Sequence, residues 1–413
     1  MATLQNGNSI AKDFDLPLSR WIEIAEEFGQ KVRQGLEKDH TEIKCLPSYI
    51  FPTMKGIIKG ITYVLDLGGS NLRGAVVSLD ENGAHFLTPV KTLKMPWLRN
   101  VPFPRNDFLA MQADLLKSLD FPQACPLGYC FSFPTEALPN GDATLIQWTK
   151  GLQIPETLGE NIGGMLTDYI AQHCPEVKIT SVCVLNDTVA SLFAGLARDK
   201  TDACIGLIVG TGTNMASFFP ADHVPKIKGV VADHRLIPIN LESGNFNAPF
   251  LNQWDQKVDS DSDNKGEQLF EKAVSGMYLG WIFKAVFPNS PLDADAGAKG
   301  LVEMLNSEQQ VPEDHRAVAT AIYERSFKLV AAQLAGLIQV LDGYSSIKTV
   351  KIVAEGGLFW SKVHPQKAYA QCVQDQLADL RAKMGLGTLK IEFRKLDQAN
   401  LLGSAMAALS VED

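Results

Sequence analysis

The sequence predicts an α/β protein built from two related halves. Apolar strand-like segments alternate with segments of helical periodicity along the chain, which is the pattern of an α/β fold. A strand–glycine turn–strand unit also occurs twice, at 61–79 and at 205–219, and each turn carries a small hydroxyl residue followed by Asn. This weak internal symmetry suggests a duplicated domain with a cleft between the two halves.

Length and composition narrow the class of protein. The 413 residues suffice for two or three domains, and 38 Lys+Arg against 47 Asp+Glu give a formal net charge of −9, which argues against a nucleic-acid binder. No apolar run approaches the ~18 residues of a membrane span, and no secretory signal is expected. The seven cysteines are scattered, which is typical of free thiols in the cytoplasm. We therefore expect a cytoplasmic protein without membrane or nucleic-acid partners, whose metal, if any, is a hard cation held by oxygen atoms.

The first expected element is an amphipathic helix near the N-terminus. Its apolar face would consist of residues that recur at helical spacing, namely Trp21, Ala25, Phe28, Val32 and Leu36. A proline-containing link then leads to the first strand–turn–strand unit, for which we expect a hairpin.

The turn of this hairpin, DLGGSN (66–71), has the chemistry of a phosphate site. Its paired glycines let backbone N–H groups converge on an anion, and Ser70 adds a hydroxyl donor. Asp66, at the end of the strand, would hold a hydrated Mg²⁺. An ordinary tight turn is the alternative for a single glycine pair, but the second turn, GTGTN (210–214), repeats the design and favours phosphate binding.

Two further junctions carry polar residues. Ser132, Thr149 and Lys150 are hydrogen-bond donors that lie where the chain changes direction. The alternative interpretation is that Thr149 and Lys150 simply form the end of a solvated loop. Asn186 and Asp187 stand between a predicted strand and a predicted helix. Asn186 would cap that helix, and Asp187 lies where α/β enzymes place a catalytic carboxylate.

The C-terminal half continues the α/β pattern. We expect one helical face over 270–282, a buried helix over 327–341, and a strand over 351–354 that ends in a third glycine turn, Glu355–Gly357. The acidic stretch 255–266 predicts a surface loop. It begins like a calcium loop but lacks the glycine and the glutamate that such a loop requires, so we expect no calcium site.

Six ordered blocks resemble the hexokinase family of the actin-like sugar kinases. They are DLGGSNLR (66–73), FSFP (131–134) with WTKG (148–151), LNDTVASL (185–192), GLIVGTGTN (206–214), INLESGNF (239–246) and NKGEQLFEKAVSGMYLG (264–280). The resemblance implies a two-domain actin-like (ribonuclease H-like) α/β fold with a sugar cleft between the domains. The implied parts are a small domain at 56–185, rejoined by 402–413, and a large domain at 186–401, on which residues 1–55 pack.

The resemblance also implies an activity: phosphorylation of the 6-hydroxyl of a hexose, glucose above all, by ATP and Mg²⁺, the first step of glycolysis. Asp187 is implied as the catalytic base, and Lys150 as the second catalytic residue, which orients sugar and phosphate. The implied sugar-binding residues are Ser132, Thr149, Lys150, Asn186, Asp187, Asn214, Glu242, Gln268 and Glu271. The implied nucleotide-binding residues are Asp66, Gly68, Gly69, Ser70, Asn71, Gly210, Thr211, Gly212, Thr213, Gly356, Gly357 and Ser404. Asp66 would position Mg²⁺ through water.

The chain departs from the family pattern at three places. Glu242-Ser243-Gly244 replaces Glu-Trp-Gly, Glu355-Gly356-Gly357 replaces the Asp-Gly-Ser turn on the adenosine side, and residues 400–405 replace a Gly-Ser-Gly helix start. Two alternatives stay open: a sugar-sensing protein that binds hexose without turnover, and a kinase for mannose, fructose or an amino sugar. No feature of the sequence predicts an oligomeric state.

Overall fold

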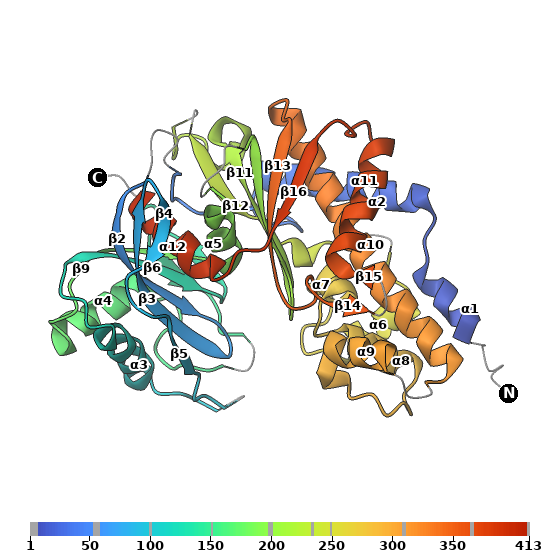
Figure 1. Cartoon of the computed structure of the whole chain (residues 1–413), viewed down its shortest axis with the longest axis horizontal. Helices are drawn as coiled ribbons and strands as arrows, with labels where there is room; N and C mark the ends of the chain where they lie inside the picture. The colour runs from blue at the N-terminus through green and yellow to red at the C-terminus, as the bar shows by residue number, and fades with distance from the viewer. Residues whose placement is uncertain are drawn as a thin grey trace.

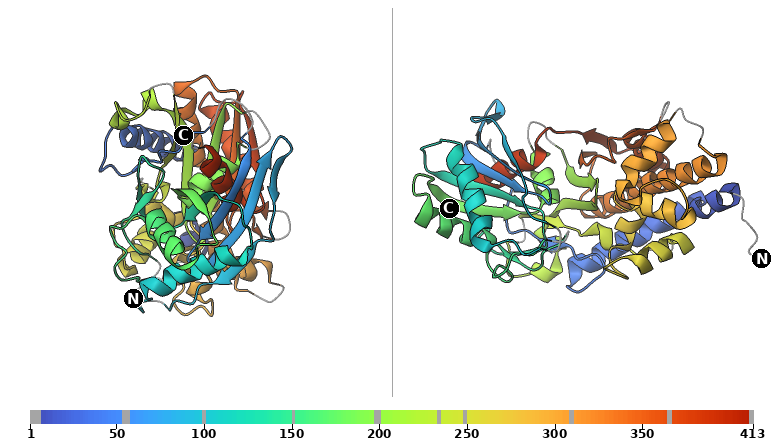
Figure 2. Two further views of the ribbon diagram at one scale, coloured as in Figure 1. Left: turned by 90° about the vertical axis from the view of Figure 1, so that its left-hand side faces the viewer. Right: turned by 90° about the horizontal axis from the view of Figure 1, so that it is seen from below.

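The computed structural model describes residues 7–52, 58–98, 101–149, 152–196, 201–232, 235–247, 250–307, 311–363 and 367–410. It has two lobes, each built around a mixed β-sheet, with helices α5 and α12 between them (Figure 1). Helix α1 and the end of α12 lie in opposite lobes of the elongated molecule (Figure 2). The predicted alternation of strands and helices is confirmed.

The first sheet forms the lobe drawn mainly in blue and green in Figure 1. Its strands, in spatial order, are β4 (Gly83–Phe86), β3 (Asn71–Asp80), β2 (Gly60–Leu67), β6 (Cys125–Phe131) and β9 (Ile179–Leu185), with β5 (Lys91–Lys94) also paired to β3. Tyr63 and Leu65 pack with α3 (Arg105–Ser118) and α4 (Ile162–His173), while Val64 packs with α12 (Ala399–Ser410) on the other face. Burial of both faces explains why β2 is apolar almost throughout.

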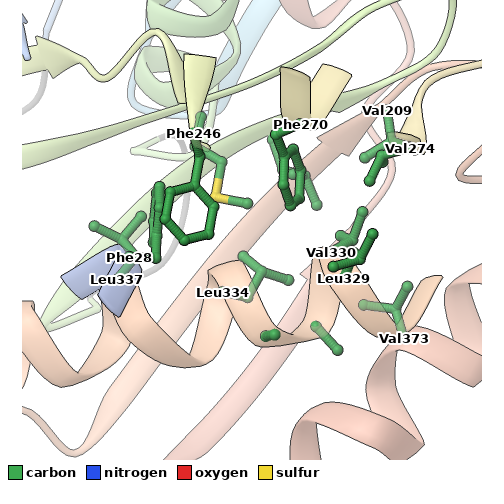
Figure 3. Close-up of a cluster of buried hydrophobic side chains, with 14 of the residues drawn as sticks. Phe28, Val209, Phe246, Phe270, Val274, Leu329, Val330, Leu334, Leu337 and Val373 are labelled. Carbon is green, nitrogen blue, oxygen red and sulfur yellow. The ribbon is translucent and has the colours of Figure 1, made fainter. Parts of the chain in front are cut away.

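The second sheet is the core of the other lobe. Its strands, in spatial order, are β1 (Leu46–Pro47), β12 (Leu236–Asn240), β11 (Thr213–Pro220), β10 (Ala203–Val209), β13 (Thr349–Glu355) and β16 (Lys390–Arg394). The helices on its main core face are α2 (Leu18–Glu37), α10 (Glu313–Tyr344) and α11 (Tyr369–Lys383). Figure 3 shows this core, in which Phe28, Phe246 and Phe270 pack over Leu334 and Leu337.

The two sheets share one pairing pattern, which confirms the internal symmetry seen in the sequence. In the first sheet, β4–β3 and β3–β2 are antiparallel, and β2–β6 and β6–β9 are parallel. In the second sheet, β12–β11 and β11–β10 are antiparallel, and β10–β13 and β13–β16 are parallel. The glycine turns β2–β3 and β10–β11 are therefore equivalent positions of the two halves.

Helices α5 (Asp187–Ala194) and α12 connect the halves by an exchange. Helix α5 follows the last strand of the first sheet but packs on β10 of the second, whereas α12 follows the last strand of the second sheet and packs on β2 and β6 of the first. The two helices also cross each other so closely that a Cβ atom on Gly403 would collide with the carbonyl group of Ala190. This exchange supports the predicted domain limits, 56–185 with 402–413 and 186–401, which we retain as a proposal.

The remaining elements lie around the sheets. They are α1 (Gly7–Ala11), α6 (Gln253–Asp261), α7 (Leu269–Val274), α8 (Leu279–Val286), α9 (Gly297–Asn306), the hairpins β7 (Thr135–Ala137) with β8 (Ala143–Leu145) and β14 (Lys362–Val363) with β15 (Lys367–Ala368), and the short 3₁₀ turns η1 (Lys12–Phe14), η2 (Ala221–His223), η3 (Pro225–Ile227), η4 (Ser243–Asn245) and η5 (Ala294–Ala296). In the described ranges no helix combines the length and the apolar character needed to cross a membrane.

Two predictions of local structure are wrong. The helical face expected over 270–282 is broken between α7 and α8, because the N–H group of Gly276 donates to the carbonyl of Gly210 (2.6 Å) instead of continuing a helix. The loop expected over 255–266 is helical up to Asp261. Asn252 and Asp255 form a capping box at its start, and the Asp255 carboxylate pairs with the buried Arg325 (2.6 Å).

Candidate active site

Most of the predicted site residues lie at the carboxyl ends of strands or in the adjoining turns. Asp66 is in the last part of β2, Ser132 follows β6, Asn186 follows β9, and Glu355 ends β13. The carboxyl ends of parallel strands are where open α/β sheets bind ligands. The equivalent positions of both sheets therefore supply the candidate site.

Electrostatic interactions show that carboxylates from both halves come together around Asp187. Burial raises the pKa of Asp66, Arg73 counteracts this, and Asp187 raises it further. Burial also raises the pKa of Glu355 to about 7, with Asp66 and Asp187 adding to the effect and Arg73 opposing it. The pKa of Glu242, in the second lobe, is raised by burial and also by Asp187, while Asn240 and Lys44 lower it. Asp187 thus lies within electrostatic range of carboxylates from both halves.

Asp187 is the first residue of α5, and its surroundings hold it there. The side chain of Asn186 caps the helix by accepting from the N–H group of Thr188 (2.8 Å), as the sequence predicts. The same N–H group donates to Oδ1 of Asp187 (2.8 Å), and the hydroxyl of Thr188 lies 3.3 Å from that oxygen. These contacts engage one carboxylate oxygen and leave Oδ2 outside them.

The second lobe presents a group of half-buried polar side chains. Asn214 lies in β11, Glu242 follows β12, and Glu271 is in α7. Oε2 of Glu271 accepts from the N–H group of Thr213 (2.9 Å), which ties α7 to the β10–β11 turn. Gln268 adopts a left-handed conformation (φ 51°) just before α7, and its Oε1 accepts from Asn264 (3.0 Å). The structure therefore brings Asn214, Glu242 and Glu271 close to the second glycine turn, and Gln268 lies just before α7.

The first glycine turn has its carbonyl groups occupied. The carbonyl of Gly69 accepts from the indole of Trp97 (3.1 Å), and the carbonyl of Ser70 accepts from the N–H group of Met95 (3.1 Å). Gly68 closes the turn by donating to the carbonyl of Asn71 (3.0 Å). Both Ser70 and Asn71 are exposed. The turn is thus held from its carbonyl side, which suits a loop that offers N–H groups to an anion.

The second and third glycine turns pack against each other. Gly356 adopts φ +109°, and a Cβ atom there would collide with the carbonyl of Val209. A Cβ atom on Gly210 would lie 3.2 Å from the Cα atom of Gly356, and one on Gly212 would lie 2.5 Å from Oε2 of Glu271. Gly357, in contrast, has nothing within 4 Å of its Cβ position. The exposed Thr211 lies between Gly210 and Gly212.

Ser404 does not join this arrangement. Ser404 lies within α12, fully buried against Gly128 of β6, and its hydroxyl has no partner among the described residues. The close packing of α12 on the sheet leaves Ser404 no exposed surface, and its contact with a nucleotide stays a prediction. Lys150 falls outside the described residues. Its neighbour Thr149 is half-buried, and its carbonyl accepts from Leu152 (3.1 Å).

Sequence reasoning missed three supporting residues. Arg73 pairs with Asp66 and donates to Oε1 of Gln398 (3.0 Å), the residue that precedes α12. Asp259 accepts from the buried Lys272 (2.6 Å) and from Gly266 (3.0 Å), which fixes the loop before Gln268. Asn240 bonds to both Asn214 and Glu242. The available signals were an Arg inside the first block, an acidic residue before the last block, and an Asn at the end of a buried strand.

The carboxylates of the candidate site could supply only part of the ligands that a metal ion needs. In the part of the chain that the structure describes, no group of three or more His, Cys, Asp and Glu side chains could hold a metal ion. Asp66 is nevertheless a buried carboxylate within range of Asp187 and Glu355. Mg²⁺ commonly takes one or two carboxylates, with water and substrate phosphate supplying the rest. These residues fit that manner of binding and do not fit an all-protein cage.

Comparison with known proteins agrees with this geometry. Two models of the hexokinase family match the chain, one over residues 7–196 and the other over residues 204–290 and 292–410. The chain belongs to the hexokinase family. Hexokinase-2 of Schizosaccharomyces pombe is 32% identical over 288 residues, which cover 67% of this chain and 63% of that protein. Hexokinase-2 of Oryza sativa subsp. japonica is 28% identical over 445 residues, which cover 95% of this chain and 88% of that protein.

A solved structure supports the same family and fold. The hexokinase from Schistosoma mansoni complexed with glucose matches this chain with a TM-score of 0.79 and 26% sequence identity, over 98% of both chains. The predicted fold of the actin-like sugar kinases is confirmed by this match. A surface pocket of about 620 Å³ between α3 and α4 shares no residue with the site described above.

Proposed function

We propose that this protein transfers the γ-phosphoryl group of ATP to the 6-hydroxyl of a hexose, with glucose as the first candidate. The observation that carries the proposal is the position of Asp187. This residue begins the helix between the two halves, within electrostatic range of Glu242 on one side and of Asp66 and Glu355 on the other. Family membership and the glucose complex of the Schistosoma mansoni hexokinase support the choice of substrate.

The proposed sugar side is rich in groups that can form hydrogen bonds with sugar hydroxyl groups. Asn214, Glu242 and Glu271 gather near the β10–β11 turn, and Asn186 lies beside Asp187. Ser132, Thr149, Lys150 and Gln268 complete the proposed set. A hexose is a neutral polyol, and amide and carboxylate oxygens accept hydrogen bonds from its hydroxyl groups. A site built this way rejects sugars that lack a hydroxyl, because its own polar groups would stay unpaired.

The proposed nucleotide side consists of the glycine turns. The N–H groups of Gly69 and Ser70 and the hydroxyl of Ser70 would hold phosphate oxygens, and Thr211 would add a hydroxyl group from the turn at 210–213. The N–H group of Gly68 already donates to Asn71 and the hydroxyl of Thr213 donates to Ile208 (3.0 Å), so these two residues would act by shaping their turns. Gly356 and Gly357 would face the adenosine. Asp66 would hold Mg²⁺ through water, and that ion, when bound, neutralises charge on the phosphate oxygens.

The reaction asks the protein mainly for positioning and for one proton acceptor. The 6-hydroxyl oxygen forms a bond to the γ-phosphorus, the bond from that phosphorus to the bridging oxygen breaks, and ADP leaves. Asp187 accepts the hydroxyl proton, and Lys150 orients the transferring group. Closure of the lobes over the sugar would exclude water, which would otherwise compete as acceptor. The cytoplasmic location and the place in glycolysis stay predictions.

The test is a phosphorylation assay of the purified chain with Mg-ATP and glucose. We expect hexose 6-phosphate, identified by the position of the phosphate in a ³¹P and ¹³C NMR spectrum. A panel with mannose, fructose and glucosamine tests the choice of sugar. Hexose binding without any phosphate transfer, across the panel and with other nucleotide donors, would overturn the proposal in favour of a sugar-sensing role.

A further inference from the structure

A continuous set of hydrogen bonds runs from the core helix α10 to the carboxylate of Glu242. Nε2 of Gln333 donates to the carbonyl of Ser243 (2.8 Å), and the N–H group of Ser243 donates to Oδ1 of Asn214 (3.1 Å). Nδ2 of Asn214 donates to Oδ1 of Asn240 (2.7 Å), and Nδ2 of Asn240 donates to Oε1 of Glu242 (2.7 Å). Gln333 is fully buried, and Asn240 is 6% exposed. The relay thus begins in the core and ends at a half-buried carboxylate of the proposed sugar site.

Both amide ends of Asn240 are occupied, as are those of Asn214, and Asn240 is the one that bonds to the carboxylate. Its Oδ1 accepts from Asn214 and lies 3.4 Å from the N–H group of Glu242, while its Nδ2 donates to the carboxylate. Rotation of the amide would therefore break bonds on both sides. Neighbouring bonds of this kind polarise and reinforce one another in a protein interior.

The backbone at Glu242 needs such support. Glu242 has a left-handed conformation (φ 55°), which is costly for a residue with a side chain. Its carbonyl accepts from both the N–H group and the side chain of Asn245 (3.1 Å each), so the main chain is held separately from the carboxylate. The direction of the carboxylate itself is set by the bond from Asn240.

We propose that Asn240 is a positioning residue, which directs the carboxylate of Glu242 toward a hydroxyl group of the hexose. This inference rests on the proposed function, because it assigns Glu242 to the sugar. Oε1 is taken by Asn240, and Oε2 is the oxygen that accepts from the hexose. Asn240 itself does not touch the sugar.

Several charged groups act on the same carboxylate. Burial raises the pKa of Glu242, the donation from Asn240 and the charge of Lys44 lower it, and Asp187 raises it. Glu271, on the packed helix α7, lies with its Cβ near Gly244 of the same turn. Without the hydrogen bond from Asn240, burial and the charge of Asp187 raise the pKa of Glu242 with less opposition. Hexose binding should then weaken at a higher pH as the solution is acidified, because a protonated Glu242 is a poorer acceptor.

The test is a double-mutant cycle on hexose binding, measured by calorimetry without nucleotide. Asn240→Leu should weaken glucose binding about 10- to 100-fold at pH 7.5, the range expected for a lost hydrogen bond to a charged group. In a Glu242→Gln background, Asn240→Leu should have less than about a third of that effect, because the bond it then removes goes to a neutral amide oxygen instead of a charged carboxylate. Ser217→Ala, which removes one buried hydrogen bond from neighbouring β11, is the matched control and should leave the affinity unchanged.

A second measurement needs no sugar. The loss of stability caused by Asn240→Leu should be larger at pH 8 than at pH 4, because acid protonates Glu242 and weakens it as an acceptor, and this difference should vanish in the Glu242→Gln background. Equal effects of Asn240→Leu in both backgrounds would overturn the inference while leaving the kinase proposal standing. Coupling without hexose binding by the wild type would instead overturn the proposed function, and the sugar role of Asn240 with it.

Discussion

The two equivalent glycine turns have similar sequences but need their glycines for different reasons. In the β2–β3 turn, a Cβ atom on Gly68 would meet only the carbonyl of Asn71, at 3.7 Å. In the β10–β11 turn, a Cβ atom on Gly212 would lie 2.5 Å from Glu271, and one on Gly210 would approach Gly356. The first turn has free space around it, whereas the second is packed between two other loops.

The two copies of the duplicated motif therefore have different roles. The open turn, with its carbonyls held by Met95 and Trp97, keeps room for a phosphate on its N–H side. The packed turn holds Glu271 through Thr213 and supports the third turn at Gly356, so it also builds the sugar side. Substitutions in the second turn should therefore affect stability and sugar binding in addition to nucleotide binding, whereas substitutions in the first turn should affect nucleotide binding alone.

The largest effect is expected at Gly356. Gly356→Ala places a side chain at φ +109° and drives its Cβ into the carbonyl of Val209, so neither backbone can relax cheaply. We expect a loss of about 3 kcal/mol or more in the free energy of unfolding, measured by urea denaturation. Gly357→Ala is the matched control, because nothing lies within 4 Å of its Cβ position, and it should change stability by less than about 0.5 kcal/mol. Equal losses at both positions would contradict the packing described here.

A smaller but more specific effect is expected at Gly212. The added methyl of Gly212→Ala meets the carboxylate of Glu271, which must move and give up its bond from Thr213. We expect glucose to bind about 10-fold more weakly in calorimetry, the cost of about one misplaced hydrogen bond. An unchanged affinity for glucose would show that Glu271 does not bind the sugar.

The corresponding change in the first turn should leave glucose binding alone. Gly68→Ala has space for its methyl group, so the free energy of unfolding should fall by no more than about 1 kcal/mol. The KM for Mg-ATP should rise several-fold, because the methyl group reduces the approach of phosphate to the backbone. A rise in the KM for glucose with an unchanged KM for ATP would reverse the division of tasks between the turns.

A pH-dependent effect is expected at Glu355, beside the packed turn. Burial raises the pKa of its carboxyl to about 7, from an ordinary value of 4.5. The folded protein therefore binds this proton more tightly than the unfolded chain, and stability from this group falls as pH rises from about 4.5 to about 7. In metal-free buffer, Glu355→Gln should be more stable than the wild type at pH 8, and the gain should disappear at pH 4.5. Thermal denaturation of the wild type and of Glu355→Gln across this pH range is the measurement. A difference in stability that does not change with pH would contradict the raised pKa of Glu355.

Much of the fold follows from local patterns in the sequence. The two hairpins, the capped start of α5 and the buried helix α10 were predicted because each depends on residues close in the chain. The helix α6 was missed because its acidic composition hides a capping box and a buried ion pair to Arg325, 70 residues away. The break before α8 depends on a bond to Gly210, a partner that no local pattern names.

The candidate site divides in the same way. Asp187 and the glycine turns were found from motifs, since a motif records the residues that face a ligand. The burial of Ser404 was not predicted, because it follows from how α12 crosses the first sheet. Asn240 and Arg73 were missed because their roles lie in contacts with distant residues, Asn214 and Gln398 among them.

The most direct test of the account is Asp187→Asn, with hexose binding and turnover measured on the same preparation. The amide keeps the size of the side chain and an oxygen that can accept from Thr188, so the start of α5 should be preserved. We predict glucose binding within a few-fold of the wild type and a kcat for phosphorylation that is about 10²–10⁴-fold lower, as expected for a lost general base. A kcat close to that of the wild type, with intact glucose binding, would contradict the role of Asp187 and the placement of the chemistry at this helix.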